Sequence, residues 1–274
     1  MRLVSLFIKK PLAFVWKDFI NEISYKFAFS MQFFSILITT VTFFYLSRLL
    51  GDVGISYLKP YGGDYFAFVL IGVALFNYLK ISMEGLSNSI REGQMLGTLE
   101  ALLVTQTEIP TIIISSSLYS FIFASFKVAV YLLLGTLVFG INMSNANLIG
   151  AFLILLLTII SFSSFGIISA SFVMVLKRGD PVSWAFTNIS GILGGLYYPV
   201  SVLPKWLQKL SYVLPVTYSL EGMRLALLKG YSLSALLPNI VALLVFSVIM
   251  LPLSMLVFRY AVKRAKTDGT LTQY

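Results

Sequence analysis

Long apolar stretches, separated by short polar or turn-forming segments, run through the whole chain. A helix needs about 20 apolar residues to cross the hydrocarbon of a bilayer. Six stretches are predicted to do so: 26–49, 65–83, 110–139, 148–175, 182–199 and 232–258. The turn-like sequence GINMSNAN at 140–147 divides the third from the fourth. The pattern predicts an all-α polytopic membrane protein, a single transmembrane domain over 1–274 with six transmembrane helices.

The segment 6–24 has a different pattern. Trp16, Phe19 and Ile20 recur at helical spacing, and Lys17 lies on the opposite, polar face. Helices with this pattern lie in the membrane interface rather than across it. We therefore predict an N-terminal amphipathic elbow helix.

Prolines interrupt the stretch before the last span. Pro204 and Pro215 divide it into pieces that are each too short to cross a membrane. The segment 203–229 is therefore predicted to form two short re-entrant outer helices.

Composition agrees with a membrane protein. The chain of 274 residues has a mean hydropathy of +0.90 and is 11% charged, whereas soluble domains are about 25% charged. It contains no cysteine and no histidine, so thiolate and imidazole metal sites and histidine catalysis are excluded, and we expect no metal site. The Lys and Arg residues that give the chain its net charge of +9 flank the apolar segments. This placement favours membrane lipid over nucleic acid as the partner of these cations.

The cations also predict an orientation. With six spans both termini lie on one side, and that side carries thirteen of the twenty Lys and Arg residues, against six on the other. The positive-inside rule then places both termini in the cytoplasm of a multi-pass protein of the cell membrane. Because the apolar run after Arg2 is short, we expect no removable signal peptide.

The longest polar interruption, 84–106, is predicted to be cytoplasmic. Gly97 breaks a short helix, Thr98 can cap a new turn, and Glu100 lies near the positive end of that turn, with Leu99 on a small apolar face. An amphipathic connector without a partner has the same pattern.

Two sequence motifs resemble those of ABC type-2 transporter permeases. GTLE at 97–100, followed by LLVT at 102–105, resembles the coupling-helix region of that family. GGLYYPV at 194–200, followed by LPKWL at 203–207 and LPVTY at 214–218, is similar to the signature before the last span. The order of elbow helix, six spans and outer re-entrant helices fits as well.

The resemblance implies partners. Permeases of this family pair with a second copy and bind a separate ABC ATPase subunit through the elbow helix, here Trp16, Lys17 and Phe19, and through a coupling helix. The matching coupling residues are Arg91, Glu92, Gly97, Thr98, Leu99 and Glu100. The chain has no G-x-x-x-x-G-K-[ST] phosphate loop, so it is not expected to be an enzyme or to hold a cofactor, and ATP and Mg²⁺ belong to the partner.

The resemblance also implies an outer gate in the short outer helices. The residues that match are Tyr197, Tyr198, Pro199, Trp206, Thr217 and Glu221. The aromatic residues among them fit an interfacial aromatic belt equally well. Glu221 and Arg224 lie three residues apart on the second outer helix, at a spacing that allows them to pair, and such pairs usually contribute little when they are exposed.

Two further features allow alternative interpretations. Gly191 and Gly195 form a small-xxx-small pair, which predicts either a permease dimer interface or close packing within one chain. Lys127 lies within the third span and is a candidate functional charge. Alternatively, the Lys127 side chain extends toward the outer interface and places its charge there.

These features predict the permease subunit of an ATP-driven exporter. The aromatic, apolar spans favour a hydrophobic, amphipathic or lipid-linked substrate without identifying it, and both alternating access and a continuous channel remain open. The alternatives are a secondary transporter, disfavoured by the absence of internal repeats and the scarcity of intramembrane charge, and a membrane scaffold without transport activity.

Overall fold

The computed structural model describes residues 12, 15–16, 19–20, 22–51, 55–95, 97, 109–176 and 180–267, and within these residues it is all helical, with no strand. The long helices are α2 (Lys26–Leu50), α4 (Tyr65–Met95), α6 (Ile109–Leu133, continued by the π-helical turn η2, Leu134–Val138), α7 (Leu148–Leu176) and α11 (Leu237–Thr267). Each of these five contains a segment long and apolar enough to cross a membrane.

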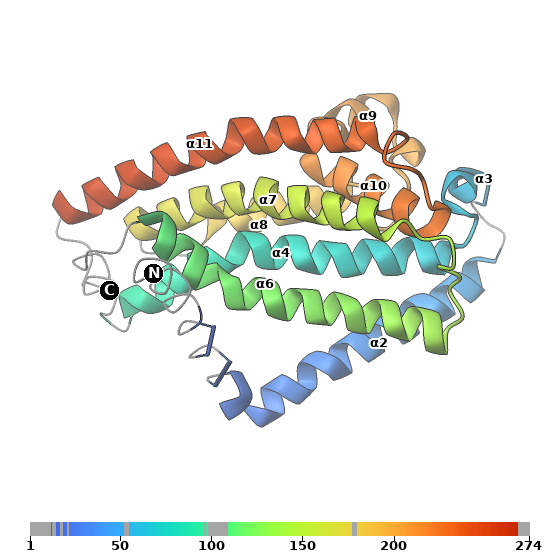
Figure 1. The fold of residues 1–274 in the computed structure, drawn as a ribbon, viewed down its shortest axis with the longest axis horizontal. Coiled ribbons are helices and arrows are strands. Elements are labelled where there is room, and N and C mark those ends of the chain that lie inside the picture. Colours follow the sequence, from blue (N-terminus) through green and yellow to red (C-terminus); the bar gives the residue numbers. More distant parts are fainter. Residues whose placement is uncertain are drawn as a thin grey trace, which may run out of the picture.

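The short elements gather at one end of the bundle (Figure 1). They are α3 (Ile55–Leu58), η1 (Lys59–Tyr61), η3 (Val200–Val202), α9 (Lys205–Ser211) and α10 (Pro215–Lys229). We call this end apical. At the opposite, basal end, α4, α7 and α11 finish and α2, α6 and α8 (Pro181–Leu193) begin.

α4 forms the centre of the fold. It packs against α2, α6, α7, α8 and α10, and most of its apolar segment is buried. Phe68, Leu70 and Ile71 of α4 pack with Ile154 of α7 and Leu220 of α10 in the main core. By contrast α2 buries only Ile36 and Thr40 and leans away from the bundle at the basal end (Figure 1).

Small residues bring α7 close to its neighbours. A β-carbon added at Gly166 would lie 2.7 Å from the Ser82 carbonyl oxygen of α4, so the two backbones are almost in contact. The Oγ atoms of Ser161 and Ser247 are 2.9 Å apart and join α7 to α11. Small side chains and interhelical hydroxyl bonds are typical of helix packing within a bilayer.

The helix predicted at 65–83 does not end there. α4 continues for three more turns to Met95, because no proline interrupts it and because Leu86 and Ile90 are buried against α7 and α11 in a second core. The polar interruption at 84–106 is therefore helical in its first half, and Gly97, with a φ of 67°, follows the end of that helix.

The span predicted at 182–199 is wrong in length. α8 has 13 residues and ends at Leu193, so it is about 20 Å long and does not reach across the hydrocarbon. Gly195, at φ 81°, has left the helical conformation. The described part of the chain thus has five helices of spanning length where six were predicted.

The last helix is shifted relative to the predicted 232–258. Residues 233–236 form turns and α11 begins at Leu237. The helix extends to Thr267 because Ala261, Val262 and Ala265 continue the buried face of the second core. The helices predicted at 26–49, 110–139 and 148–175 correspond to α2, α6 with η2, and α7. The segment predicted as two short helices, 203–229, contains α9 and α10.

Candidate functional site

The basal end is held together by the carboxylate of Asp180, the N-cap of α8. Its Oδ1 accepts from the backbone N–H of Ser183 (2.9 Å) and from the Ser169 hydroxyl of α7, and its Oδ2 accepts from the Ser87 hydroxyl of α4 (2.6 Å). One side chain thus joins three helices. We call Asp180, Ser87, Ser169 and Ser183 the Asp180 cluster.

Sequence analysis gave Asp180 no role, although a signal was present. Aspartate followed by proline is a typical helix start, with an acidic N-cap and proline in the first turn. What the sequence did not indicate is that hydroxyls from two other helices reach the same carboxylate.

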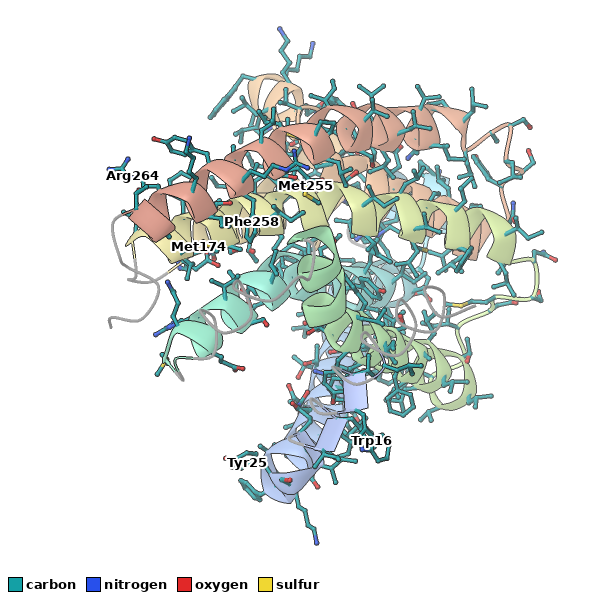
Figure 2. The ribbon with its side chains drawn as sticks, turned by 60° about the vertical axis from the view of Figure 1, so that its left-hand side comes forward. Trp16, Tyr25, Met174, Met255, Phe258 and Arg264 are labelled. Carbon is teal, nitrogen blue, oxygen red and sulfur yellow. The ribbon has the colours of Figure 1, made fainter. Side chains whose placement is uncertain are left out.

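The second core holds the last turns of α4. Gln94 donates from Nε2 to the Met174 carbonyl oxygen of α7 (3.2 Å), and Leu86 and Ile90 pack against Met174 and Phe258. Figure 2 shows Met174, Met255 and Phe258 where α7 and α11 run together. The basal segment of α4 is therefore fixed to two neighbours rather than free in solution.

Two of the predicted coupling residues lie within this anchored segment, and the other four follow it in the sequence. Arg91 and Glu92 are exposed on the last turns of α4, and Gly97 adopts a left-handed conformation two residues after the helix. The other three, Thr98, Leu99 and Glu100, lie outside the described residues.

The elbow residues are partly described. Trp16 and Phe19 are helical and exposed, with ring centroids 6.0 Å apart, and Trp16 lies near the first turns of α2 (Figure 2). Lys17 lies outside the described residues.

The apical end is organised by a buried cation, Arg224 of α10, which is 2% exposed. Its guanidinium donates to three main-chain carbonyl oxygens, those of Phe68 (3.0 Å), Gly195 (2.8 Å) and Leu196 (2.8 Å), and lies over the Phe68 ring at 3.5 Å from the centroid. A side chain at Gly72 would overlap the guanidinium. Arg224 thus joins α10 to α4 and to the turn after α8, an arrangement we call the Arg224 cap.

Arg224 therefore does not form an exposed surface pair with Glu221. Leu220, Arg224 and Leu227 recur at helical spacing, which places Arg224 on the apolar, buried stripe of α10. Glu221 is half-buried beside it, and burial raises the pKa of its carboxyl while the charge of Arg224 opposes that rise. Burial also raises the pKa of Tyr61 to about 12.

The predicted gate residues separate into two groups. Pro199, Thr217 and Glu221 line an apical cavity of about 190 Å³ together with Tyr61 and Arg224. Thr217 donates to the Ser211 carbonyl oxygen at 2.6 Å, which closes the turn between α9 and α10.

The aromatic gate residues do not line that cavity. Tyr197 stacks on Phe43 of α2 with centroids 5.9 Å apart, Tyr198 donates to the Ile192 carbonyl oxygen at 2.6 Å, and Trp206 is 65% exposed. Their outward placement agrees with an aromatic belt.

The glycine pair does not form a stripe on one helix. Gly195 lies beyond the end of α8, while a β-carbon at Gly191 would lie 3.3 Å from the ring of Phe76 of α4. Within the described residues, Gly191 therefore serves packing inside one chain, and its role in a dimer stays a prediction.

Most of the chain matches a known protein family. The model of the family described as ABC-2 type transporter matches residues 10–228. The chain belongs to the ABC-2 type transporter family. The match runs from the elbow segment through α10, and so includes both the Asp180 cluster and the Arg224 cap. ABC-2 membrane domains are permeases without catalytic activity of their own. None of the curated proteins compared with the chain matches it.

Proposed function

We propose that this ABC-2 permease is the membrane subunit of an ATP-driven exporter that moves a hydrophobic, amphipathic or lipid-linked substrate out of the cytoplasm. It works as a dimer with a second copy of itself and with two ABC ATPase subunits, which bind ATP and Mg²⁺. The observation that carries this proposal is the family match over residues 10–228, since the chain itself contains no phosphate loop.

The helix directions support a topology of six crossings. The chain passes from the basal to the apical end between Asp180 and Leu237 (Figure 1), so α8 and the segment after it make a sixth crossing that no single helix completes. Six crossings put both termini on the basal side. That side carries most of the Lys and Arg residues, and we infer that it faces the cytoplasm of a cell-membrane protein.

The length of α4 supports a coupling role for its basal end. Its 31 residues span about 46 Å, whereas the hydrocarbon is about 30 Å thick. The excess length brings Arg91, Glu92 and Gly97 out of the membrane. Closure of the ATPases would push on this end and on the coupling residues Thr98, Leu99 and Glu100. The push opens a path between the two permeases, by alternating access or as a continuous channel.

The decisive experiment is affinity purification of the full-length permease from its native membranes, with identification of any bound P-loop ATPase. We expect an ABC ATPase to copurify and its ATPase rate to depend on the permease. Glu100→Arg should weaken this stimulation several-fold without reducing membrane insertion. Lys205→Glu, an exposed charge reversal on the apical helix α9, is the matched control and should leave it unchanged.

Purification of the permease without any P-loop ATPase would favour the secondary transporter or scaffold. Wild-type ATPase stimulation by the Glu100→Arg variant would remove the proposed role of the coupling segment.

A further inference from the structure

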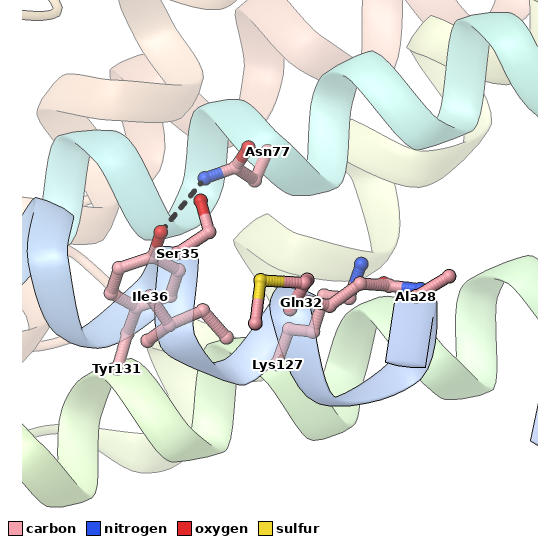
Figure 3. Close-up of a pocket in the computed structure, with 8 residues that line it drawn as sticks. Ala28, Gln32, Ser35, Ile36, Asn77, Lys127 and Tyr131 are labelled. Atoms are coloured by element: carbon pink, nitrogen blue, oxygen red, sulfur yellow. Dashed lines mark hydrogen bonds between the residues drawn. The ribbon is translucent and has the colours of Figure 1, made fainter. Parts of the chain in front are cut away.

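A polar cavity lies between α2, α4 and α6, where α2 begins to lean away from the bundle (Figure 1). Its volume of about 300 Å³ is at the lower limit of small-molecule sites. That space suits a headgroup rather than a whole amphipathic molecule. Its polar lining residues are Gln32 and Ser35 of α2, Asn77 of α4, and Lys127 and Tyr131 of α6 (Figure 3).

Lys127 gives this cavity a positive charge inside the membrane-spanning region. It is the only charged residue between Ile109 and Leu176, and it lies within the helical stretch formed by α6 and η2, eleven residues before the apical end at Val138. A lysine near the bilayer centre costs about 3 kcal/mol or more on insertion scales. Such a charge needs a compensating partner or a ligand.

The amine of Lys127 has few partners within the chain. It lies over the Phe123 ring, 4.6 Å from the centroid, and no hydrogen bond joins it to any described residue. Phe123 lies one turn closer to the basal end than Lys127, so the Lys127 side chain points toward the basal end. The alternative of snorkelling requires the opposite direction, toward the apical interface. The ammonium group can donate three hydrogen bonds, and Lys127 lines the cavity without donating any of them to the described part of the chain.

Further donors face the same space. Asn77 donates from Nδ2 to the Tyr131 hydroxyl oxygen at 3.4 Å, and the side chain of Thr39 is a second hydrogen-bond partner of Tyr131. Figure 3 shows Ser35 pointing toward this pair. The one nearby carboxylate that acts on Lys127, Glu22, already accepts a hydrogen bond from the Gln32 side chain. A cation beside the Ser35 hydroxyl donor favours an anionic oxygen ligand.

The surroundings suit a ligand that carries an apolar tail. Met31 of α2 lines the cavity and is exposed, so the cavity is open to the lipid-facing surface of this helix. Two aromatic pairs, Phe29 with Phe123 and Phe33 with Phe126, each with centroids 5.9 Å apart, join α2 to α6 and fix the width of the space.

We propose that the cavity around Lys127 binds an anionic phosphate group, held by the Lys127 ammonium and by the Ser35 hydroxyl, with Tyr131 as part of the polar wall. The phosphate can come from a membrane phospholipid headgroup or from free phosphate. The site needs no ATPase, so its test does not depend on the proposed transport function.

Native mass spectrometry of the full-length permease in detergent tests this site with phosphatidylglycerol, and with diacylglycerol of the same chains as the phosphate-free probe. We expect phosphatidylglycerol to bind, and Lys127→Met to weaken that binding about tenfold, the loss expected for one charge-assisted contact. Lys127→Arg should retain binding. Lys80→Met, which removes an exposed cation of α4 outside the cavity, should bind as wild type.

A second arm uses inorganic phosphate alone, detected by ³¹P NMR with the protein in a phosphate-free detergent. Binding of inorganic phosphate that is lost in Lys127→Met supports the site with a soluble source. Its absence alongside phosphatidylglycerol binding supports a lipid source. Equal binding of phosphatidylglycerol by wild type and Lys127→Met, or equal binding of diacylglycerol and phosphatidylglycerol, would overturn the proposal.

Discussion

The Arg224 guanidinium donates its hydrogen bonds to main-chain carbonyl oxygens. Three carbonyl groups from two segments accept its hydrogen bonds, and two of them, at Gly195 and Leu196, lie where the chain leaves α8 and cannot be satisfied by helix bonds. A guanidinium suits this task because its donors form a planar fork and it keeps its charge when buried.

Arg224→Met is expected to destabilise the fold by about 3 kcal/mol, because it leaves buried carbonyl groups without donors. Thermal unfolding of the purified permease in detergent measures this. Lys229→Met removes an exposed cation from the same helix and should change the melting temperature little. Equal melting temperatures for both variants would show that the Arg224 cap contributes no stability.

The burial of Arg224 could be predicted from the sequence, but its partners could not. Spacing within α10 places Arg224 on the buried stripe with Leu220 and Leu227, yet its partners lie 28, 29 and 156 residues away in the chain. A local pattern can show that a polar group is buried, but it cannot name a partner brought by tertiary packing. The same limit hid the Ser87 and Ser169 hydroxyls at Asp180.

At the scale of elements, the contact between α4 and α7 depends on glycine. Gly166→Ala is expected to destabilise the permease by about 1–3 kcal/mol, because the added methyl group meets the Ser82 and Met83 carbonyl oxygens at under 3 Å. Gly85→Ala is the matched control: its β-carbon would meet only Ser120 at an ordinary 3.5 Å. It should be neutral or stabilising by helix propensity. Thermal unfolding of both variants separates steric overlap from a general effect of removing glycine.

The start of α8 offers a second comparison. Asp64 caps α4 by accepting from the Phe66 N–H at 2.9 Å, whereas Asp180 caps α8 and also binds two hydroxyls. Asp64→Ala should lower the free energy of unfolding by about 1 kcal/mol, the usual contribution of an N-cap. Asp180→Ala should lower it by clearly more. Hydrogen exchange should also quicken at the basal ends of α4 and α8 in Asp180→Ala only. Equal losses in the two variants would reduce the Asp180 cluster to an ordinary cap.

Hydropathy predicted the existence of most elements because burial in lipid requires long apolar helices. It failed at their ends. The polar segment from Glu84 to Met95 looked like a separate short helix, but it continues the preceding span as one helix, with Leu86 and Ile90 buried. Apolar residues after Leu193 looked like the rest of a span, but Gly195 leaves the helical conformation. Helix ends depend on packing and backbone conformation, which hydropathy does not report.

For the whole molecule, the proposed orientation is directly testable because the chain has no cysteine. Ser234→Cys lies at the exposed apical turn and Asn88→Cys on the exposed basal part of α4. A membrane-impermeant maleimide added to intact cells should label the first and not the second, and permeabilised cells should show labelling of both. The reverse pattern would invert the topology and place the Arg224 cap in the cytoplasm.

The uninterrupted course of α4 has a mechanical consequence. From Phe68, whose carbonyl oxygen binds Arg224, to Gln94, which binds α7, the helix runs about 39 Å without a proline or a break in its hydrogen bonding. A rod of this kind transmits axial displacement with little loss. Under the proposed coupling, work done at the basal end would arrive at the apical end as movement of the same solid body, without a relay of separate conformational steps between the two faces.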